Sequence, residues 1–212
     1  MIGIFGGSFD PVHLGHLGLA EAAYRQLGLE RVLFVPLGLP PHRPQLQASP
    51  AQRVELLRAA LEPTPYFEIN TLEVEKDSPS WTVETLAQLR QSLPGETLCL
   101  LLGSDAFKPL NSWYRWRRIT DYCHIVVLSR RGDEQKLNDE VADFLASKRT
   151  GQLHEMPACT AGNGGVLWLE AELPEISSTR LRAAIAARQP FMQYTPPAVA
   201  ALIQEYKLYG YG

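Results

Sequence analysis

The sequence predicts an α/β fold: a Rossmann-like, doubly wound, mostly parallel sheet with helices on both faces and a small C-terminal helical extension. Short apolar runs of strand length alternate along the chain with segments whose apolar residues recur at helical spacing. Several of these runs end in glycine or serine clusters, where ligand-binding loops of open α/β sheets lie. We find no internal repeat, low-complexity tract or interdomain linker, so we expect one domain over residues 1–212.

The first strand–helix–strand unit lies at the start of the chain. Residues 1–5 are apolar and predict a short buried strand that ends at two glycines. In residues 14–27, leucine, alanine and tyrosine recur at three- and four-residue steps, which predicts a helix. The apolar residues 31–35 predict a second strand. Strand, helix and strand in this order form the βαβ unit of a parallel sheet.

The rest of the chain continues the alternation. Further strands are expected at residues 66–74, 97–102, 124–128 and 166–169. Further helices are expected at residues 51–61, 82–91, 134–147, 180–187 and 196–205, with helical pieces around residues 113–119. Residues 36–50 hold five prolines and residues 151–165 hold several glycines, so both predict loops, the second of them mobile. From about residue 177 the chain forms the helical extension, which we expect to pack on the domain.

Composition and charge narrow the class of protein. Hydrophobic residues make up 45% and charged residues 20%, as in ordinary globular proteins. A net charge of −3 argues against nucleic acid as a partner, because proteins that coat nucleic acid usually need an excess of basic residues. No apolar run reaches about 18 residues, so no membrane partner is expected. Three cysteines without C-x-x-C spacing fit a reducing, cytoplasmic location. A homo-oligomer is compatible with the sequence.

Residues 6–16, which read GGSFDPVHLGH and are termed the signature segment below, bridge the first strand and the first helix. Gly6 and Gly7 let the backbone approach a ligand closely. The helix start offers unpaired N–H groups and the positive end of the helix dipole. His13 and His16 lie three residues apart on one face of that start and could donate hydrogen bonds to phosphoryl oxygens. The segment therefore predicts a phosphate site.

The histidine pair allows two other interpretations. A metal site would need a third ligand, and the sequence offers no convincing one. An isolated His-x-x-His would most simply be explained by helix capping or surface exposure. Here the two glycines, the preceding strand and the following helix agree with an anion site instead. The fingerprints G-x-x-x-x-G-K-[ST] and G-x-G-x-x-G are absent, so P-loop and dinucleotide sites are not indicated.

A second anion site is indicated near the C-terminal extension. Ser177, Ser178 and Thr179 begin a helix, so their N–H groups and hydroxyls could bind a phosphate. Arg182 lies one turn further on and could reach the β- or γ-phosphate of a nucleotide. The alternative is an ordinary Ser/Thr-capped helix with solvated arginines.

Other polar and aromatic residues admit two interpretations each. Asp105 follows a buried strand and would either accept hydrogen bonds from a ribose hydroxyl or cap a helix. Trp113 offers a flat surface for a pyridine ring, or else packs in the core. For Trp116 we prefer core packing.

The signature segment resembles that of the nucleotidyltransferase superfamily, whose core is H-x-G-H, and in its longer form that of the bacterial nicotinate-nucleotide adenylyltransferases. Further strings match motifs of the latter family in the same order: residues 40–43 (PPHR), 80–82 (SWT), 103–105 (GSD), 113–116 (WYRW) and 176–182 (ISSTRLR). Three positions depart from the family pattern, with Arg43 in place of lysine, Trp81 in place of tyrosine, and Ser78 where glycine is common. The resemblance covers nearly the whole chain.

The resemblance implies a reaction and a set of site residues. ATP and nicotinate mononucleotide would give nicotinate adenine dinucleotide and pyrophosphate, in NAD biosynthesis, with Mg²⁺ on the triphosphate and no metal-binding residue assigned. Catalytic roles are expected for His13, His16, Arg43 and Arg182. Contacts to ATP are also expected from Gly6, Gly7, Ser8, Phe9, Gly103, Asp105, Ile176, Ser177, Ser178 and Thr179. Contacts to the acceptor are expected from Ser8, Phe9, Arg43, Thr82, Asp105, Trp113 and Tyr114.

Three rival functions remain open at this stage. One is another H-x-G-H transferase that acts on pantetheine phosphate or a polyol phosphate. Another is a nucleotide-binding sensor that no longer catalyses, although both histidines and Arg182 are present. The third is a nucleic-acid-binding α/β module, against which the slight acidic balance and the absence of a basic stripe count. The arginines at 115, 117 and 118 cluster locally, but a solvated helix face explains them adequately.

Overall fold

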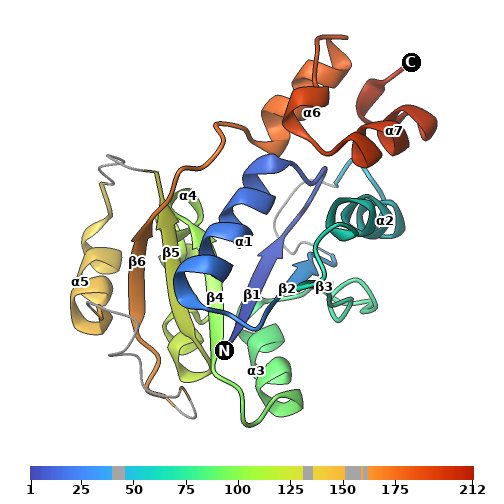
Figure 1. The fold of residues 1–212 in the computed structure, drawn as a ribbon. Coiled ribbons are helices and arrows are strands. Elements are labelled where there is room, and N and C mark those ends of the chain that lie inside the picture. Colours follow the sequence, from blue (N-terminus) through green and yellow to red (C-terminus); the bar gives the residue numbers. More distant parts are fainter. Residues whose placement is uncertain (40–45, 131–135, 151–158, 160–161) are drawn as a thin grey trace. The chain divides into compact units, whose positions relative to one another are not determined.

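The computed structural model describes residues 1–39, 46–130, 136–150, 159 and 162–212 (Figure 1). Its strands are β1 (Ile2–Gly7), β2 (Arg31–Pro36), β3 (Phe67–Ile69), β4 (Leu98–Gly103), β5 (His124–Ser129) and β6 (Val166–Glu170). Its α-helices are α1 (Leu14–Leu27), α2 (Pro50–Leu61), α3 (Thr82–Ser92), α4 (Ser104–Phe107), α5 (Asp139–Lys148), α6 (Ser178–Ala186) and α7 (Pro197–Glu205). Short 3₁₀ turns are η1 (Leu110–Ser112), η2 (Trp116–Asp121), η4 (Met192–Tyr194) and η5 (Leu208–Gly210).

The strands form one sheet in the order β3-β2-β1-β4-β5-β6. The pairings of β1 with β4, β4 with β5 and β5 with β6 are all parallel. Strand β5 is buried along its whole length and β4 along all but its last residue. Strands covered on both faces read as continuous apolar runs, which is why LCLLLG and HIVVLS lack an alternating pattern. The predicted α/β, Rossmann-like fold with a parallel sheet is confirmed.

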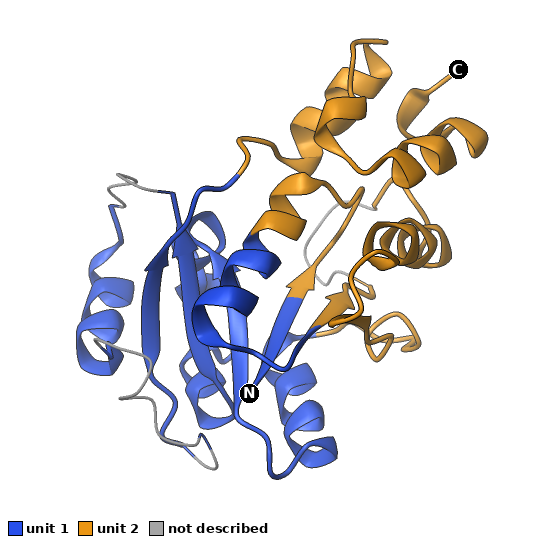
Figure 2. Ribbon diagram, viewed as in Figure 1, with its two compact units in different colours: residues 1–5, 19–32, 81–173 blue, residues 6–18, 33–80, 174–212 orange. Residues whose placement is uncertain are grey.

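The chain divides into two compact units (Figure 2). Unit 1 comprises Met1–Phe5, Leu19–Val32 and Trp81–Leu173. Unit 2 comprises Gly6–Gly18, Leu33–Ser80 and Pro174–Gly212. The signature segment and the C-terminal helices α6 and α7 thus belong to the same unit. A single domain over residues 1–212 stays a prediction.

Two predicted elements differ from the observed ones. The strand expected at residues 66–74 is only β3, because Asn70 turns the backbone and its side chain accepts the N–H of Leu72 at 3.1 Å. The helix expected from residue 134 begins at Asp139, since Asn138 caps it by accepting the N–H of Val141 at 2.9 Å. The helical pieces expected around residues 113–119 are present as the 3₁₀ turn η2.

One prediction about an individual side chain is confirmed in unit 1. Trp116 is 6% exposed and packs edge-on against Phe144, with ring centroids 4.8 Å apart, as core packing requires. Cys99 and Cys123 are fully buried and behave as small apolar residues. The predicted loop at residues 151–165 falls largely outside the described residues.

Candidate functional site

Phe9 and two glycines shape the signature segment. Phe9 is fully buried with a left-handed φ of 46°, and its ring meets the ring of His16 edge-on at 5.1 Å between centroids. A Cβ on Gly7 would lie 2.9 Å from the Phe9 ring, and one on Gly15 would lie 3.0 Å from the His13 ring. Glycine at these two positions therefore leaves room for the aromatic and imidazole rings that form the site.

His13 and His16 form a stacked pair where α1 begins. Their ring centroids are 3.7 Å apart and the ring planes are inclined by 22°. The backbone N–H of His13 donates to Nδ1 of His16 at 3.2 Å, and that of His16 donates to Nδ1 of His13 at 3.3 Å. Because each Nδ1 accepts, a neutral ring carries its hydrogen on Nε2. Nε2 is therefore the nitrogen that would donate to a phosphate oxygen.

The surroundings of the pair favour the neutral imidazoles. Desolvation lowers the pKa of His13 from 6.5 to about 4, although a backbone hydrogen bond opposes the shift. Desolvation, with a smaller contribution from the charge of His13, lowers the pKa of His16 well below its usual value. At pH 7 the pair therefore offers neutral N–H donors. The negative charge of a bound phosphate would raise both pKa values.

The carboxylate of Asp10 holds the middle of the signature segment. Asp10 is 1% exposed, and its Oδ2 accepts the N–H of Gln47 at 2.9 Å. Its Oδ1 accepts the N–H of Ala48 at 3.1 Å and the hydroxyl of Tyr209 at 2.9 Å. One buried side chain thus ties the signature segment to residues 47–48 and to the C-terminal turn η5.

Arg53 from α2 supports the same segment. Its Nη1 donates to the carbonyl of Ser8 at 2.9 Å, and its Nη2 donates to the carbonyl of Leu37 at 2.6 Å. Burial lowers the pKa of Arg53, while the negative charge of Asp10 opposes the shift. A guanidinium stays protonated in proteins, so Arg53 is a buried cation that fixes the backbone at Ser8.

The C-terminal part of unit 2 donates to three consecutive carbonyls of the signature segment. Nη1 of Arg182 donates to the carbonyl of Asp10 at 2.6 Å. The hydroxyl of Ser178 donates to the carbonyl of Pro11 at 3.0 Å, and the hydroxyl of Thr195 donates to the carbonyl of Val12 at 3.0 Å. Backbone carbonyls in a loop need partners when they are buried. The two predicted anion sites are therefore held together by hydrogen bonds.

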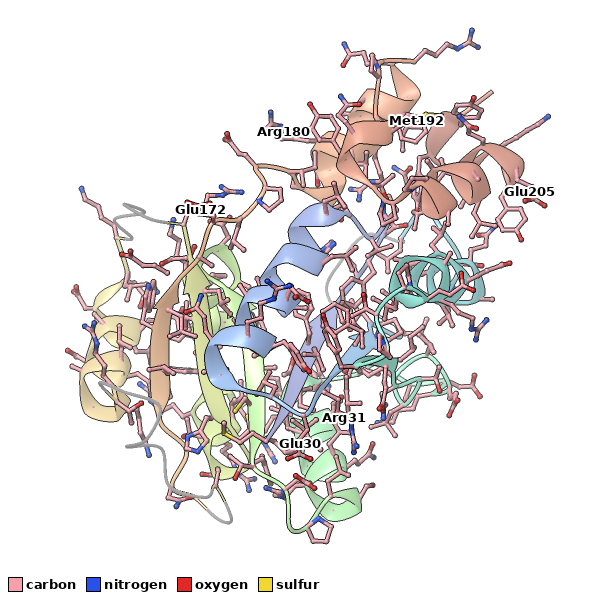
Figure 3. All side chains as sticks on the ribbon, in the orientation of Figure 1. Glu30, Arg31, Glu172, Arg180, Met192 and Glu205 are labelled. Atoms are coloured by element: carbon pink, nitrogen blue, oxygen red, sulfur yellow. The ribbon has the colours of Figure 1, made fainter. Side chains whose placement is uncertain are left out.

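Helix α6 begins at the predicted second anion site. Ser177 is its N-cap and accepts the N–H of Arg180 through its side chain at 3.2 Å, as the capped-helix alternative predicts. The Nη2 of Arg182 donates to Oγ1 of Thr179 at 3.4 Å. The side chain of Arg180, labelled in Figure 3, is 66% exposed and lies 3.9 Å from the carboxylate of Glu175. Arg182 is thus directed to the signature segment and Arg180 is not.

In unit 1, β4 ends at a polar turn. Gly103 is the N-cap of α4, and Asp105 lies in the first turn with a 91% exposed side chain. The alternative that Asp105 caps a helix is therefore wrong, because Gly103 occupies that position. The carboxylate of Asp105 lies 3.9 Å from Nζ of Lys108. Binding of a ribose hydroxyl by Asp105 stays a prediction.

Three of the predicted acceptor residues, Thr82, Trp113 and Tyr114, lie near an aromatic group in unit 1. Thr82 begins α3, and the ring of Trp81 before it lies 4.9 Å from the ring of Tyr114. The guanidinium of Arg115 lies 5.0 Å from the centroid of the Tyr114 ring. Trp113 is half-buried at the end of η1. This part of unit 1 offers aromatic surface next to a helix start.

The predicted residues fall into three sets. Unit 2 (orange in Figure 2) holds Gly6, Gly7, Ser8, Phe9, His13, His16, Ile176, Ser177, Ser178, Thr179 and Arg182. Unit 1 holds Thr82, Gly103, Asp105, Trp113 and Tyr114. Arg43, with the rest of the PPHR string, lies outside the described residues.

The described residues show no metal cluster, and a surface cavity of unit 2 lies apart from the predicted site residues of that unit. No three His, Cys, Asp or Glu side chains of the described residues gather as a metal site, so the histidine pair has no third ligand there. A surface cavity of about 570 Å³ in unit 2 is lined by residues that include Ile185, Phe191 and Met192, the last labelled in Figure 3. None of the predicted site residues lines it. None of the described helices is both long and apolar enough to cross a membrane.

Four side chains that shape the site were not predicted from the sequence: Asp10, Arg53, Thr195 and Tyr209. Arg53 carried a signal, because it lies on the otherwise apolar buried face of α2. A charged residue on such a face indicates a buried polar network. Thr195 and Tyr209 are far from the signature segment in sequence, and no local pattern marks them.

The fold and the H-x-G-H of the signature segment indicate a nucleotidyltransferase, and comparison with known proteins agrees. Residues 4–184 match the family model described as cytidylyltransferase-like. A relative from Aeromonas hydrophila, named probable nicotinate-nucleotide adenylyltransferase, is 40% identical over 209 residues, which are 98% of this chain and 96% of the relative. A protein of the same name from Dechloromonas aromatica is 38% identical over 212 residues, 98% and 97% of the two chains.

Solved structures agree on the fold. The nicotinic acid mononucleotide adenylyltransferase of Plasmodium falciparum, complexed with NaAD, matches with a TM-score of 0.76 at 16% identity, over 100% of this chain and 98% of that one. This chain belongs to the nicotinate-nucleotide adenylyltransferase family of the cytidylyltransferase-like proteins.

Proposed function

We propose that this chain transfers the AMP group of ATP to nicotinate mononucleotide, and that residues 1–212 act as one nucleotidyltransferase domain. The observation that carries the proposal is the stacked pair of His13 and His16, whose Nδ1 atoms are both occupied by backbone N–H groups. The relatives that share 38–40% identity with this chain carry the name of that activity.

The reaction requires no protein nucleophile. An ionised phosphate oxygen of the acceptor would attack the α-phosphorus of ATP and form the new O–P bond. The bond from the α-phosphorus to the oxygen shared with the β-phosphorus would break, and pyrophosphate would leave with the electron pair of that bond. Because the attacking oxygen is already deprotonated, catalysis would consist of positioning and charge stabilisation.

Unit 2 would hold the triphosphate. Nε2–H groups of His13 and His16 would donate to phosphate oxygens as charge builds on them, with the start of α1 adding its dipole. Arg182 would contribute a positive charge from α6 while its Nη1 holds the carbonyl of Asp10. Neutral imidazoles suit this task because each can donate through Nε2–H to a phosphate oxygen without first taking up a proton.

The acceptor would be recognised by the aromatic group of unit 1. The ring of Trp113 would stack on the pyridine, and the N-terminus of α3 at Thr82 would face its carboxylate. Tyr114 would contribute its backbone next to that carboxylate. Trp81 packs against Tyr114, so it would take the place of the tyrosine that the family usually has.

Magnesium would enter as part of the substrate. Such an ion would be held mainly by triphosphate oxygens and water. The chain's part would be to bind the resulting complex through N–H donors. A cytoplasmic location is supported by three free, buried cysteines.

The test is pyrophosphate release by the full chain with ATP and Mg²⁺. Nicotinate mononucleotide, nicotinamide mononucleotide and phosphopantetheine would be offered in separate reactions. Release with nicotinate mononucleotide supports the proposal, and comparison with the amide gives the acid preference. Pyrophosphate release with phosphopantetheine alone would overturn the assignment of nicotinate mononucleotide as the acceptor. ATP binding without pyrophosphate release in any of the three reactions would indicate a non-catalytic sensor.

A further inference from the structure

We propose that Tyr209 is a positioning residue for the signature segment and acts through the carboxylate of Asp10. The inference deepens the proposed function and rests on it for one of its two readouts. Tyr209 lies at the end of the chain in η5, far in sequence from the histidines. Its role would be to set the backbone from which His13 and His16 project.

The contact between Tyr209 and Asp10 is direct and buried. The hydroxyl of Tyr209 donates to Oδ1 of Asp10 at 2.9 Å, and the two residues are 6% and 1% exposed. The same carboxylate accepts the N–H groups of Gln47 and Ala48. Three segments of unit 2 therefore meet at one side chain, three residues before His13.

The backbone of η5 is shaped to deliver this hydroxyl. Tyr209 has φ 59° and ψ 29°, and Lys207 has φ 49°, so two non-glycine residues of one turn are left-handed. Such conformations are uncommon for bulky residues and persist only where the surroundings impose them. The turn directs the phenol to Asp10, whose own carbonyl accepts from Arg182.

Removal of the hydroxyl should displace the segment rather than unfold it. Phenylalanine would fill the same volume and leave a buried carboxylate with one donor fewer. A shift of about 1 Å at a reacting site can cost up to roughly 10²-fold in rate. Since the histidines act on developing charge, the loss should appear in kcat more than in acceptor binding.

Tyr206 provides a matched control. Its hydroxyl donates to Oε1 of Glu55 at 2.7 Å, so it also makes a tyrosine–carboxylate hydrogen bond between the C-terminal part and another segment of unit 2. The acceptor lies on α2 rather than in the signature segment. Tyr206→Phe therefore removes the same chemical group from a contact of the same kind.

The experiment compares wild type, Tyr209→Phe and Tyr206→Phe by steady-state kinetics well below their melting temperatures. We expect Tyr209→Phe to lower kcat about tenfold and change KM for nicotinate mononucleotide by less than about twofold. Tyr206→Phe should keep kcat within about twofold of wild type. Wild-type kcat in Tyr209→Phe, or equal losses in both variants, would overturn the inference.

A second readout does not depend on the acceptor. Binding of a non-hydrolysable ATP analogue with Mg²⁺, measured by calorimetry, should be weakened at least about threefold by Tyr209→Phe and left unchanged by Tyr206→Phe. Equal binding by both variants would count against Tyr209. If wild type failed to use nicotinate mononucleotide, the proposed function would fall while this binding comparison would still decide the inference.

Discussion

His13 and His16 exchange hydrogen bonds: the backbone N–H of each residue donates to Nδ1 of the other, and the two rings stack 3.7 Å apart between centroids. This reciprocal arrangement fixes both the ring orientations and the tautomer. The position of the His13 ring also explains the glycine of H-x-G-H, because a Cβ on Gly15 would lie 3.0 Å from atoms of that ring.

Replacement of His16 by alanine should lower kcat by roughly 10²–10³-fold, the effect of losing one preorganised donor to a developing charge. Pyrophosphate release at saturating ATP and acceptor measures the change. Far-ultraviolet circular dichroism checks that the variant is folded. Near-normal turnover would remove His16 from the catalytic residues.

Stability should fall as pH decreases from about 6.5 to about 4. The folded-state pKa of His13 is lowered from 6.5 to about 4, so in this window the unfolded chain binds a proton that the folded chain does not. The contribution is fully present above pH 6.5 and is lost as pH falls to the folded pKa. Between pH 6.5 and pH 5, His13 alone should cost about 2 kcal/mol of unfolding free energy.

Urea unfolding at these two pH values measures that effect, with His13→Gln as the control. Glutamine does not titrate, so the variant should show a smaller loss between pH 6.5 and pH 5 than wild type. The same pH dependence in both proteins would contradict the assignment to His13.

Replacement of Arg182 by alanine should lower kcat/KM for ATP by roughly 10²-fold, since it removes both a cation and the donor to the carbonyl of Asp10. Arg180→Ala is the matched control on the same helix, because the Arg180 side chain is 66% exposed. It should retain activity within about twofold. Similar losses from both substitutions would show that α6 contributes only general positive charge.

The adjacent glycines Gly6 and Gly7 should respond differently to alanine. A Cβ on Gly7 would lie 2.9 Å from the buried ring of Phe9, so Gly7→Ala should lower stability by about 1–3 kcal/mol. A Cβ on Gly6 meets nothing within 4 Å, so Gly6→Ala should leave stability unchanged while raising KM for ATP. Thermal unfolding and kinetics separate the two effects, and equal stability of both variants would contradict the packing argument.

Loss of the Trp113 side chain should affect the acceptor more than ATP. Base stacking on an aromatic side chain is worth about 1–3 kcal/mol, so Trp113→Ala should raise KM for nicotinate mononucleotide roughly tenfold. Trp113→Phe keeps an aromatic surface and should retain most of the affinity. Equal increases in both Michaelis constants would exclude a pyridine site at Trp113.

The fold was predictable because its signals are local. Strands β4 and β5 are continuous apolar runs, and α1 carries its periodicity within a single segment. The ends of helices and strands were harder to predict where a single side chain determines them. Asn138 caps α5 and Asn70 turns the chain after β3, and neither effect is visible in apolar periodicity.

The candidate site was predictable only in part. The phosphate site predicted at residues 6–16 follows from glycines and histidines that are close in sequence. The support of that segment comes from Arg53, Thr195 and Tyr209, which reach it only through tertiary folding. Long-range hydrogen bonds of this kind leave no periodic trace in the sequence.

The most direct test of the histidine pair is nitrogen NMR of the imidazoles in the 15N-histidine-labelled chain at pH 7, before and after addition of a non-hydrolysable ATP analogue with Mg²⁺. We expect His13 and His16 to be neutral with the proton on Nε2, and both Nε2 resonances to shift when the analogue binds. Imidazolium rings, protons on Nδ1, or Nε2 resonances unmoved by a bound analogue would contradict the account.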